Sequence, residues 1–291
     1  MNRSLIIILL CGVTLVTSCA QKSDYVITIK TNQGDMVAIL YDETPKHKAN
    51  FIKLAKEHYF DSLLFHRVIS GFMIQGGDPN SKKAQPGERL GNGGPGYTVD
   101  AEFNPKFFHE KGSFSAARLG DEQNPTKASS GSQFYIVQGS IVPESSMEDL
   151  KIDQMKLNMG FRQIMQNPAN KPLIDSLTIV YQSGDMEAYK QKIFALVPRI
   201  EKETGMKVTK DVSPEKIKAY TTVGGAPHLD GDYTVFGKVI KGLEVIDKIA
   251  SVQRDGAERP LEDVRMTVTV EEMPKKKITK LYGYVYPEVK K

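Results

Sequence analysis

The chain has 291 residues, which is enough for one large domain or two small ones. Apolar residues make up 40% of the sequence and charged residues 25%, as in an ordinary globular protein. The 39 basic and 35 acidic residues leave a formal net charge of only +4, so the sequence lacks the excess of basic charge typical of nucleic-acid-binding proteins.

Residues 1–18 are predicted to be a lipoprotein signal peptide. Arg3 supplies the positive start, and Leu5 to Val16 is an apolar stretch shorter than the roughly 20 residues of a membrane-spanning helix. The segment 15–19, Leu-Val-Thr-Ser-Cys, resembles a bacterial lipobox, in which the cysteine is acylated. The alternative is an ordinary signal peptide with an incidental Cys19.

Acylation of Cys19 would make residues 19–24 a short polar tether on a lipid anchor. This predicts a protein of the bacterial cell envelope. The outer membrane is favoured because no Asp follows the cysteine, and the choice between its periplasmic and surface face stays open. The other cysteine is Cys11, so the mature chain would have no thiol for a disulfide.

The mature part begins with a predicted β-hairpin and a helix. Tyr25 to Thr31 alternates between apolar and polar residues, and Met36 to Tyr41 is the returning strand. Thr44 and Pro45 are typical of a helix start, and apolar residues at helical spacing continue to Tyr59.

A second predicted hairpin, Phe65 to Gln75, carries two polar side chains among apolar ones. Ser70 and Gly71 form its turn. Because strand residues alternate faces, Arg67 shares a face with Phe65, and Gln75 shares one with Met73. A few hydrogen-bonding groups in an apolar surface indicate a ligand or peptide site. The alternative is that Arg67 is a surface charge and Gln75 an edge amide.

Residues 78–96 are rich in Gly, Pro, Asn and Lys and predict a surface loop. Its glycine run, Gly91 to Gly96, lacks the preceding strand and following helix of a phosphate-binding loop. Further strands are predicted at Ser113–Ala117 and Gln133–Val137.

The apolar period becomes helical over residues 144–221. Strand patterns return at Tyr233–Ile240 and Val264–Val270, with a helix at Leu243–Val252 between them. Strands on both sides should share one sheet, so residues 144–221 are interpreted as a helical insertion. Its methionines, such as Met155 and Met159, are expected to fill its core; the alternative is an adaptable binding surface.

A basic tail, residues 274–291, ends the chain. Such charge runs are usually solvated, although near an anionic membrane this tail could add surface attraction.

Three motifs resemble the cyclophilin family of peptidyl-prolyl cis-trans isomerases. They are Phe-His-Arg-Val-Ile (65–69) with Gly-Phe-Met-Ile-Gln-Gly-Gly-Asp (71–78), Gly-Ser-Gln-Phe-Tyr-Ile (131–136), and His-Leu-Asp-Gly (228–231) with Val-Phe-Gly (235–237). The resemblance covers about residues 25–139 and 222–273. It implies a mainly β fold, a closed antiparallel barrel capped by the helices 45–59 and 243–252, in a domain of residues 25–273 interrupted by the insertion.

The resemblance also implies an activity and a site. Arg67 would donate to the prolyl nitrogen of a twisted X–Pro amide, and Gln75 would orient Arg67 or hold the substrate carbonyl. The residues that would bind substrate are Phe72, Met73, Ala117, Arg118, Gln133, Tyr135, His228, Leu229 and Tyr233.

Four of these positions depart from the commonest family residue. Tyr135 stands where Phe is common, Arg118 where Asn is common, His228 where many members have Trp, and Tyr233 where many have His. The His228 change implies weaker cyclosporin binding because an indole contact is lost. Catalysis should persist.

No cofactor and no metal are expected, because rotation about an amide bond breaks no covalent bond and the histidines show no metal-ligand spacing. The predicted function is isomerisation of X–Pro bonds in exported or envelope proteins, with proline-containing polypeptides as substrates. The alternative is a peptide-binding chaperone with little turnover. Residues 144–221 could instead dock a protein partner, with the barrel as scaffold.

Overall fold

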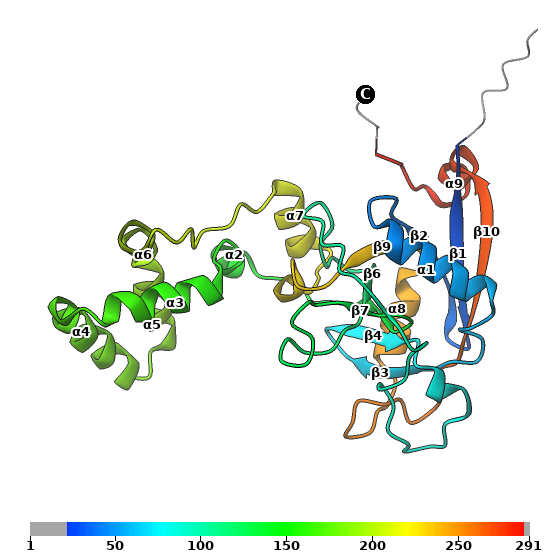
Figure 1. Ribbon diagram of the computed structural model, residues 1–291, viewed down its shortest axis with the longest axis horizontal. Helices are drawn as coiled ribbons and strands as arrows, with labels where there is room; N and C mark the ends of the chain where they lie inside the picture. Colours follow the sequence, from blue (N-terminus) through cyan, green and yellow to red (C-terminus); the bar gives the residue numbers. More distant parts are fainter. Residues whose placement is uncertain (1–21, 288–291) are drawn as a thin grey trace, which may run out of the picture.

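The computed structural model describes residues 22–287, and Figure 1 shows their arrangement. The strands are β1 (Ser23–Thr31), β2 (Gly34–Leu40), β3 (Phe65–Ile69), β4 (Met73–Gly76), β5 (Thr98–Val99), β6 (Ser113–Ala116), β7 (Ser129–Ser130), β8 (Phe134–Val137), β9 (Val235–Lys241) and β10 (Met266–Pro274). The helices are α1 (Pro45–Lys56), α2 (Met147–Leu150), α3 (Gln154–Met165), α4 (Lys171–Gln182), α5 (Met186–Ala195), α6 (Val197–Thr204), α7 (Pro214–Thr222), α8 (Leu243–Ala250) and α9 (Lys275–Tyr282).

Eight of the strands form one curled antiparallel sheet in the order β10-β1-β2-β9-β6-β8-β4-β3. The predicted mainly β architecture is confirmed, but the predicted closure of the barrel is wrong. The edges β3 and β10 do not pair as strands; the segments just before them are joined by an isolated bridge between Leu64 and Arg265. Beyond it β3 faces the irregular segment 253–264, where Val68 N–H donates to the Glu258 carbonyl at 2.8 Å. No strand is present there to extend the ladder.

The two predicted capping helices, α1 and α8, cover the sheet and complete its core. α1 packs against β9 and β10, and α8 packs against β2, β3 and β4. Phe51 of α1 stacks on Phe60 at 4.7 Å and meets the edges of Phe114 and Phe134. Because aromatic rings bury large areas and pair favourably, this cluster fixes α1 on the strands that carry the site.

The N-terminus of α1 is capped by a residue distant in sequence. Thr44 makes no side-chain cap bond, and Glu102 instead accepts the N–H groups of Lys46 and His47 at 3.1 and 3.0 Å. The His47 ring joins Glu102 to Ser129, at 2.7 and 2.9 Å. The orphan donors of the first helical turn are thus satisfied by tertiary contacts.

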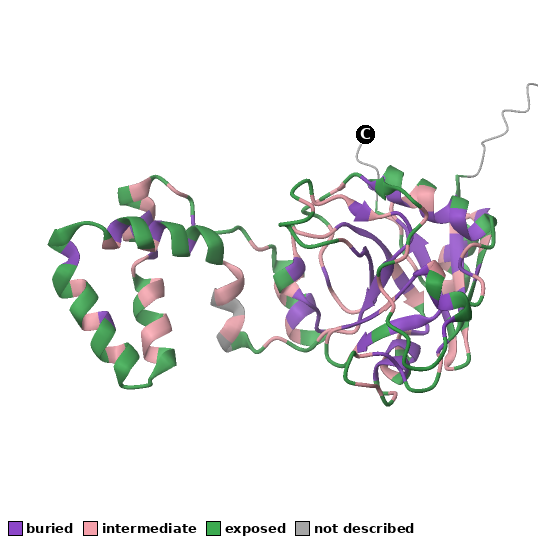
Figure 2. Cartoon of the chain, turned by 60° about the horizontal axis from the view of Figure 1, so that its bottom comes forward, coloured by how far each residue is buried: buried purple, intermediate pink, exposed green. Residues whose placement is uncertain are grey.

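Helices α2 to α6 form a lobe beside the sheet (Figure 1). Figure 2 shows that most residues of this lobe are exposed or of intermediate burial. A small core holds it together, made by Leu157, Ile164, Val197, Ile200 and Val208. Met155 and Met159 are 68% and 53% exposed, so the prediction that these two methionines fill the core is wrong.

Part of the basic tail folds onto the sheet. α9 buries Ile278 against Val26, Val37 and Ile39 of the sheet's outer face. The predicted signal peptide and Cys19 lie outside the described residues. Within 22–287, no helix combines the length and hydrophobicity required to cross a membrane.

Candidate active site

The hairpin of β3 and β4 places Arg67 opposite Gln75 in register. Arg67 is exposed between the buried His66 and Val68. The register of the hairpin shifts between Phe65 and Arg67, and Phe65 is buried in the core, so these two residues do not share a face as predicted. Its Nη1 donates to Gln75 Oε1 at 3.2 Å. Gly71 turns the hairpin with a φ of +76°, a conformation that glycine adopts without strain. The two residues predicted to be catalytic are therefore neighbours that share a hydrogen bond.

Gln133 links this pair to the 78–96 loop. Gln75 Nε2 donates to Gln133 Oε1 at 3.1 Å, and Gln133 Nε2 donates to the carbonyls of Gly91 and Gly93 at 2.8 and 2.7 Å. The two carbonyls require the amide nitrogen on their side, which points the Gln133 oxygen at Gln75. This chain of bonds restricts the directions that the Arg67 guanidinium can adopt.

A cavity of about 600 Å³ opens beside the hairpin. Of the predicted site residues, those that line it are Arg67, Phe72, Met73, Gln75, Ala117, Arg118, Tyr135, Leu229 and Tyr233. Met73, Ala117, Tyr135 and Leu229 belong to one buried apolar cluster, against which Phe72 and Tyr233 pack. The cavity combines an apolar wall with a few hydrogen-bonding groups, a composition typical of ligand sites.

Of the predicted catalytic and substrate-binding residues, Gln133 and His228 do not line the cavity. Gln133 is buried behind it. His228 is exposed, and its ring lies 5.3 Å from that of Phe72, so it forms part of the rim. Partial desolvation by its neighbours lowers the pKa of His228 below its usual value.

Arg118 lines the cavity with its charge already neutralised. Its guanidinium donates to the Asp232 carbonyl at 2.8 Å and to Asp121 at 2.5 Å. It also lies over the Tyr233 ring, 4.4 Å from the centroid. Arg118 therefore shapes the pocket wall by fixing Tyr233.

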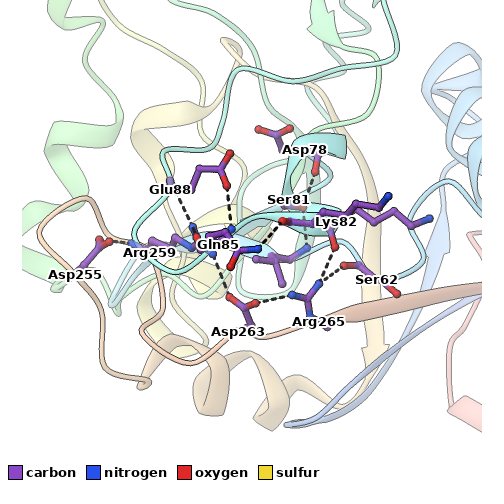
Figure 3. A network of polar contacts seen from close by, with 12 residues as sticks. Ser62, Asp78, Ser81, Lys82, Gln85, Glu88, Asp255, Arg259, Asp263 and Arg265 are labelled. Atoms are coloured by element: carbon purple, nitrogen blue, oxygen red, sulfur yellow. Dashed lines mark hydrogen bonds and ion pairs between the residues drawn. The ribbon is translucent and has the colours of Figure 1, made fainter.

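The opposite wall was not predicted from the sequence. It consists of His66, Gly87, Glu88, Arg89, Leu90, Gly91, Asn92, Asp255, Ala257 and Arg259. Figure 3 shows how buried Arg259 joins the two loops that build this wall. Its Nη1 donates to the carbonyls of Gln85 and Glu88 at 2.8 and 2.7 Å, and its Nη2 lies 3.3 Å from Asp263. The sequence gives no sign that Arg259 is buried, because Arg is usually a surface residue.

His66 is buried at the floor of this wall, with 4% of its surface exposed. Neither ring nitrogen finds a hydrogen-bond partner of good geometry within the described residues. Burial lowers the pKa of His66 to about 4, against the opposing charge of Asp78. His66 is therefore neutral at pH 7 and packs as an apolar ring.

Protonation of His66 is expected to destabilise the fold in mild acid. The folded-state pKa of about 4 lies below the ordinary 6.5, so the unfolded chain binds the proton more readily. The stability gained by a neutral His66 is present above pH 6.5 and is lost as the pH falls towards 4, by about 3 kcal/mol. Urea unfolding at pH 7.5 and 4.5 measures it, with His66→Gln as the comparison. Equal pH dependence in the two proteins would contradict this role.

Comparison with known proteins identifies the family to which the chain belongs. The model of the cyclophilin type peptidyl-prolyl cis-trans isomerase/CLD family matches residues 26–150 and 203–271. The unmatched residues 151–202 lie in the helical lobe. A cyclophilin type isomerase of Cryptosporidium parvum, solved as a crystal structure, shares the fold with a TM-score of 0.50 at 20% identity, over 86% of this chain and 98% of that one.

Two bacterial relatives have higher sequence identity to this chain than that structure. A candidate peptidyl-prolyl cis-trans isomerase of Staphylococcus haemolyticus is 30% identical over 84% of this chain and 89% of its own length. A candidate bifunctional phosphatase/peptidyl-prolyl cis-trans isomerase of Streptococcus pyogenes is 33% identical over 82% of this chain, which spans only 37% of that protein. The chain belongs to the cyclophilin-type peptidyl-prolyl cis-trans isomerase family.

Proposed function

We propose that this protein accelerates the cis–trans isomerisation of X–Pro bonds in exported or envelope proteins, with Arg67 as the catalytic donor. The observation that supports this most is the position of Arg67, held by Gln75 at the open edge of an apolar pocket. Family membership makes proline-containing polypeptides the expected substrates.

The reaction requires only that the twisted amide be bound more tightly than the planar one. Amide resonance imposes a barrier of about 18–20 kcal/mol. As the bond twists, the prolyl nitrogen becomes pyramidal and gains a lone pair. A fixed cationic donor aimed at that nitrogen interacts more strongly with the transition state than with either planar isomer. Arg67 can do this because its guanidinium stays charged and presents several N–H groups, one of which is used by Gln75.

The apolar wall would hold the proline ring while the bond rotates. Met73, Tyr135 and Leu229 are buried together, and Phe72 covers them from the rim. Their rings and methyl groups exclude water, and the lower local dielectric strengthens the Arg67 interaction. The Gln75–Gln133 pair would hold the neighbouring carbonyl or keep Arg67 in line.

Turnover at substoichiometric enzyme distinguishes catalysis from the alternative, a peptide-binding chaperone. The rate constant for an Ala-Pro tetrapeptide, measured by protease-coupled absorbance, is expected to rise linearly with enzyme kept at about one-hundredth of the peptide concentration. A chaperone would bind the peptide without accelerating its isomerisation, and a flat line would refute the enzymatic proposal. A catalyst is favoured over a chaperone because Arg67 and Gln75 both line the pocket beside its apolar wall.

The envelope location is part of the same proposal and rests on the lipobox-like segment that ends at Cys19. Expressed in a bacterium, the full chain is expected to incorporate labelled palmitate and to sediment with membranes. Cys19→Ser should abolish the label and release the protein from the membrane fraction. Unlabelled wild-type protein would contradict the anchor without affecting the proposed catalysis.

A further inference from the structure

The helical lobe is attached to the wall of the proline pocket. The chain leaves the sheet at Ser140 and returns at Gly225, and these two residues pair through hydrogen bonds of 3.2 and 3.0 Å. A Cβ on Gly139 would lie 2.3 Å from the Gly225 Cα, so the two ends are in close contact. Leu229 of the pocket follows four residues after the return point. A change in how the lobe docks would therefore act next to the pocket.

α7, the last helix before the return point, packs on the sheet domain through Lys216 and Tyr220. The Tyr220 side chain is fully buried, with its ring 5.5 Å from that of Phe108. Its hydroxyl donates to Asp230 Oδ2 at 2.7 Å. The ammonium of Lys216 lies 2.9 Å from the same oxygen. Two side chains of α7 thus bind the same carboxylate oxygen of Asp230.

The other carboxylate oxygen of Asp230 holds His109. Oδ1 accepts the backbone N–H of His109 at 3.0 Å and lies 2.9 Å from its Nδ1. A carboxylate can only accept, so Nδ1 carries the proton. In the neutral ring Nε2 then accepts, and it lies 3.0 Å from the Tyr135 hydroxyl. Tyr135 lines the proline pocket.

The bonds form one continuous chain from α7 to the pocket. It runs from Tyr220 on α7 through Asp230 and His109 to Tyr135. His109 and Tyr135 are 1% and 4% exposed, so water does not compete for these bonds. A phenylalanine at position 135 would pack in the same place but could not take part.

We propose that α7 sets the position of Tyr135 in the wall of the proline pocket through Asp230 and His109. Tyr220, Asp230 and His109 are positioning residues, since they act through Tyr135. The inference rests on the proposed function, because it assigns a device that tunes that site. Because Tyr135 lines the pocket, its ring would contact a bound proline in the planar and the twisted states alike, so its placement is expected to affect KM more than kcat.

A double-mutant cycle tests this coupling. Tyr220→Phe removes the hydroxyl and keeps the buried ring. In the Tyr135 background it is expected to raise KM for a proline tetrapeptide about fivefold, the value of one hydrogen bond, with kcat within about twofold. In the Tyr135→Phe background the same change is expected to leave KM within about twofold, because the chain of bonds is already broken. Tyr181→Phe, on the exposed face of α4, is the matched control and should change nothing.

A purely structural role for Tyr220 would give equal changes in both backgrounds, and that result, or no change in either, would overturn the proposal. Thermal unfolding of all four proteins checks that each is folded at the assay temperature. The dissociation constant of the peptide, measured by calorimetry on the same four proteins, repeats the cycle without turnover. If no protein isomerises the peptide, the proposed function fails, and the calorimetric cycle still decides whether α7 is coupled to Tyr135.

Discussion

Replacement of Arg67 by alanine is expected to lower kcat/KM for a proline tetrapeptide by about 100-fold or more, the usual cost of removing a donor aimed at transition-state charge. The fold should survive, because Arg67 is exposed and its one hydrogen bond within the described residues goes to Gln75. Protease-coupled kinetics measures the loss, and thermal unfolding checks that the melting temperature changes little.

Arg67→Lys is the matched variant for this prediction. Lysine keeps the charge but lacks the planar fork, so it cannot bond Gln75 and aim a second N–H at the prolyl nitrogen with the same geometry. We expect an intermediate rate, between wild type and Arg67→Ala. Wild-type turnover in Arg67→Ala would contradict the catalytic role assigned to Arg67, even if the pocket still bound the peptide.

Replacement of Arg259 by alanine is expected to destabilise the protein by about 2 kcal/mol or more and to raise KM several-fold. The buried guanidinium is bonded to the carbonyls of Gln85 and Glu88 and to Asp263 (Figure 3). Its loss leaves these acceptors without a donor, which is costly in a buried site. The 85–92 wall of the pocket would also loosen. Urea unfolding and steady-state kinetics measure the two effects.

The neighbouring Arg265 provides the control for Arg259. It also pairs with Asp263, at 2.7 Å, and it donates to the Ser62 carbonyl at 3.0 Å, but 43% of its side chain is exposed. Exposed ion pairs contribute little, so Arg265→Ala should cost less than about 1 kcal/mol and leave KM unchanged. Equal effects of the two substitutions would show that burial of Arg259 does not hold the wall in place.

The sequence by itself determined the local elements and one wall of the pocket. Apolar patterning predicted the hairpin of β3 and β4 that carries Arg67 and Gln75, and the resemblance to the cyclophilin motifs implied the apolar cluster around Met73, Tyr135 and Leu229. These features depend on short-range periodicity and on motifs of a few residues, which can be read without knowing how distant segments pack.

Tertiary structure alone decided the rest. His66 is buried, yet it lines the same cavity as Arg67, and a loop nearly two hundred residues later completes the second wall through Arg259. The sheet does not close into a barrel because the segment facing β3 is irregular. The bond from Tyr220 to Asp230, which connects α7 with the pocket, joins two residues whose side chains meet only when α7 docks on the sheet domain. Long-range contacts such as these depend on how whole elements pack, and no local periodicity in the sequence encodes them.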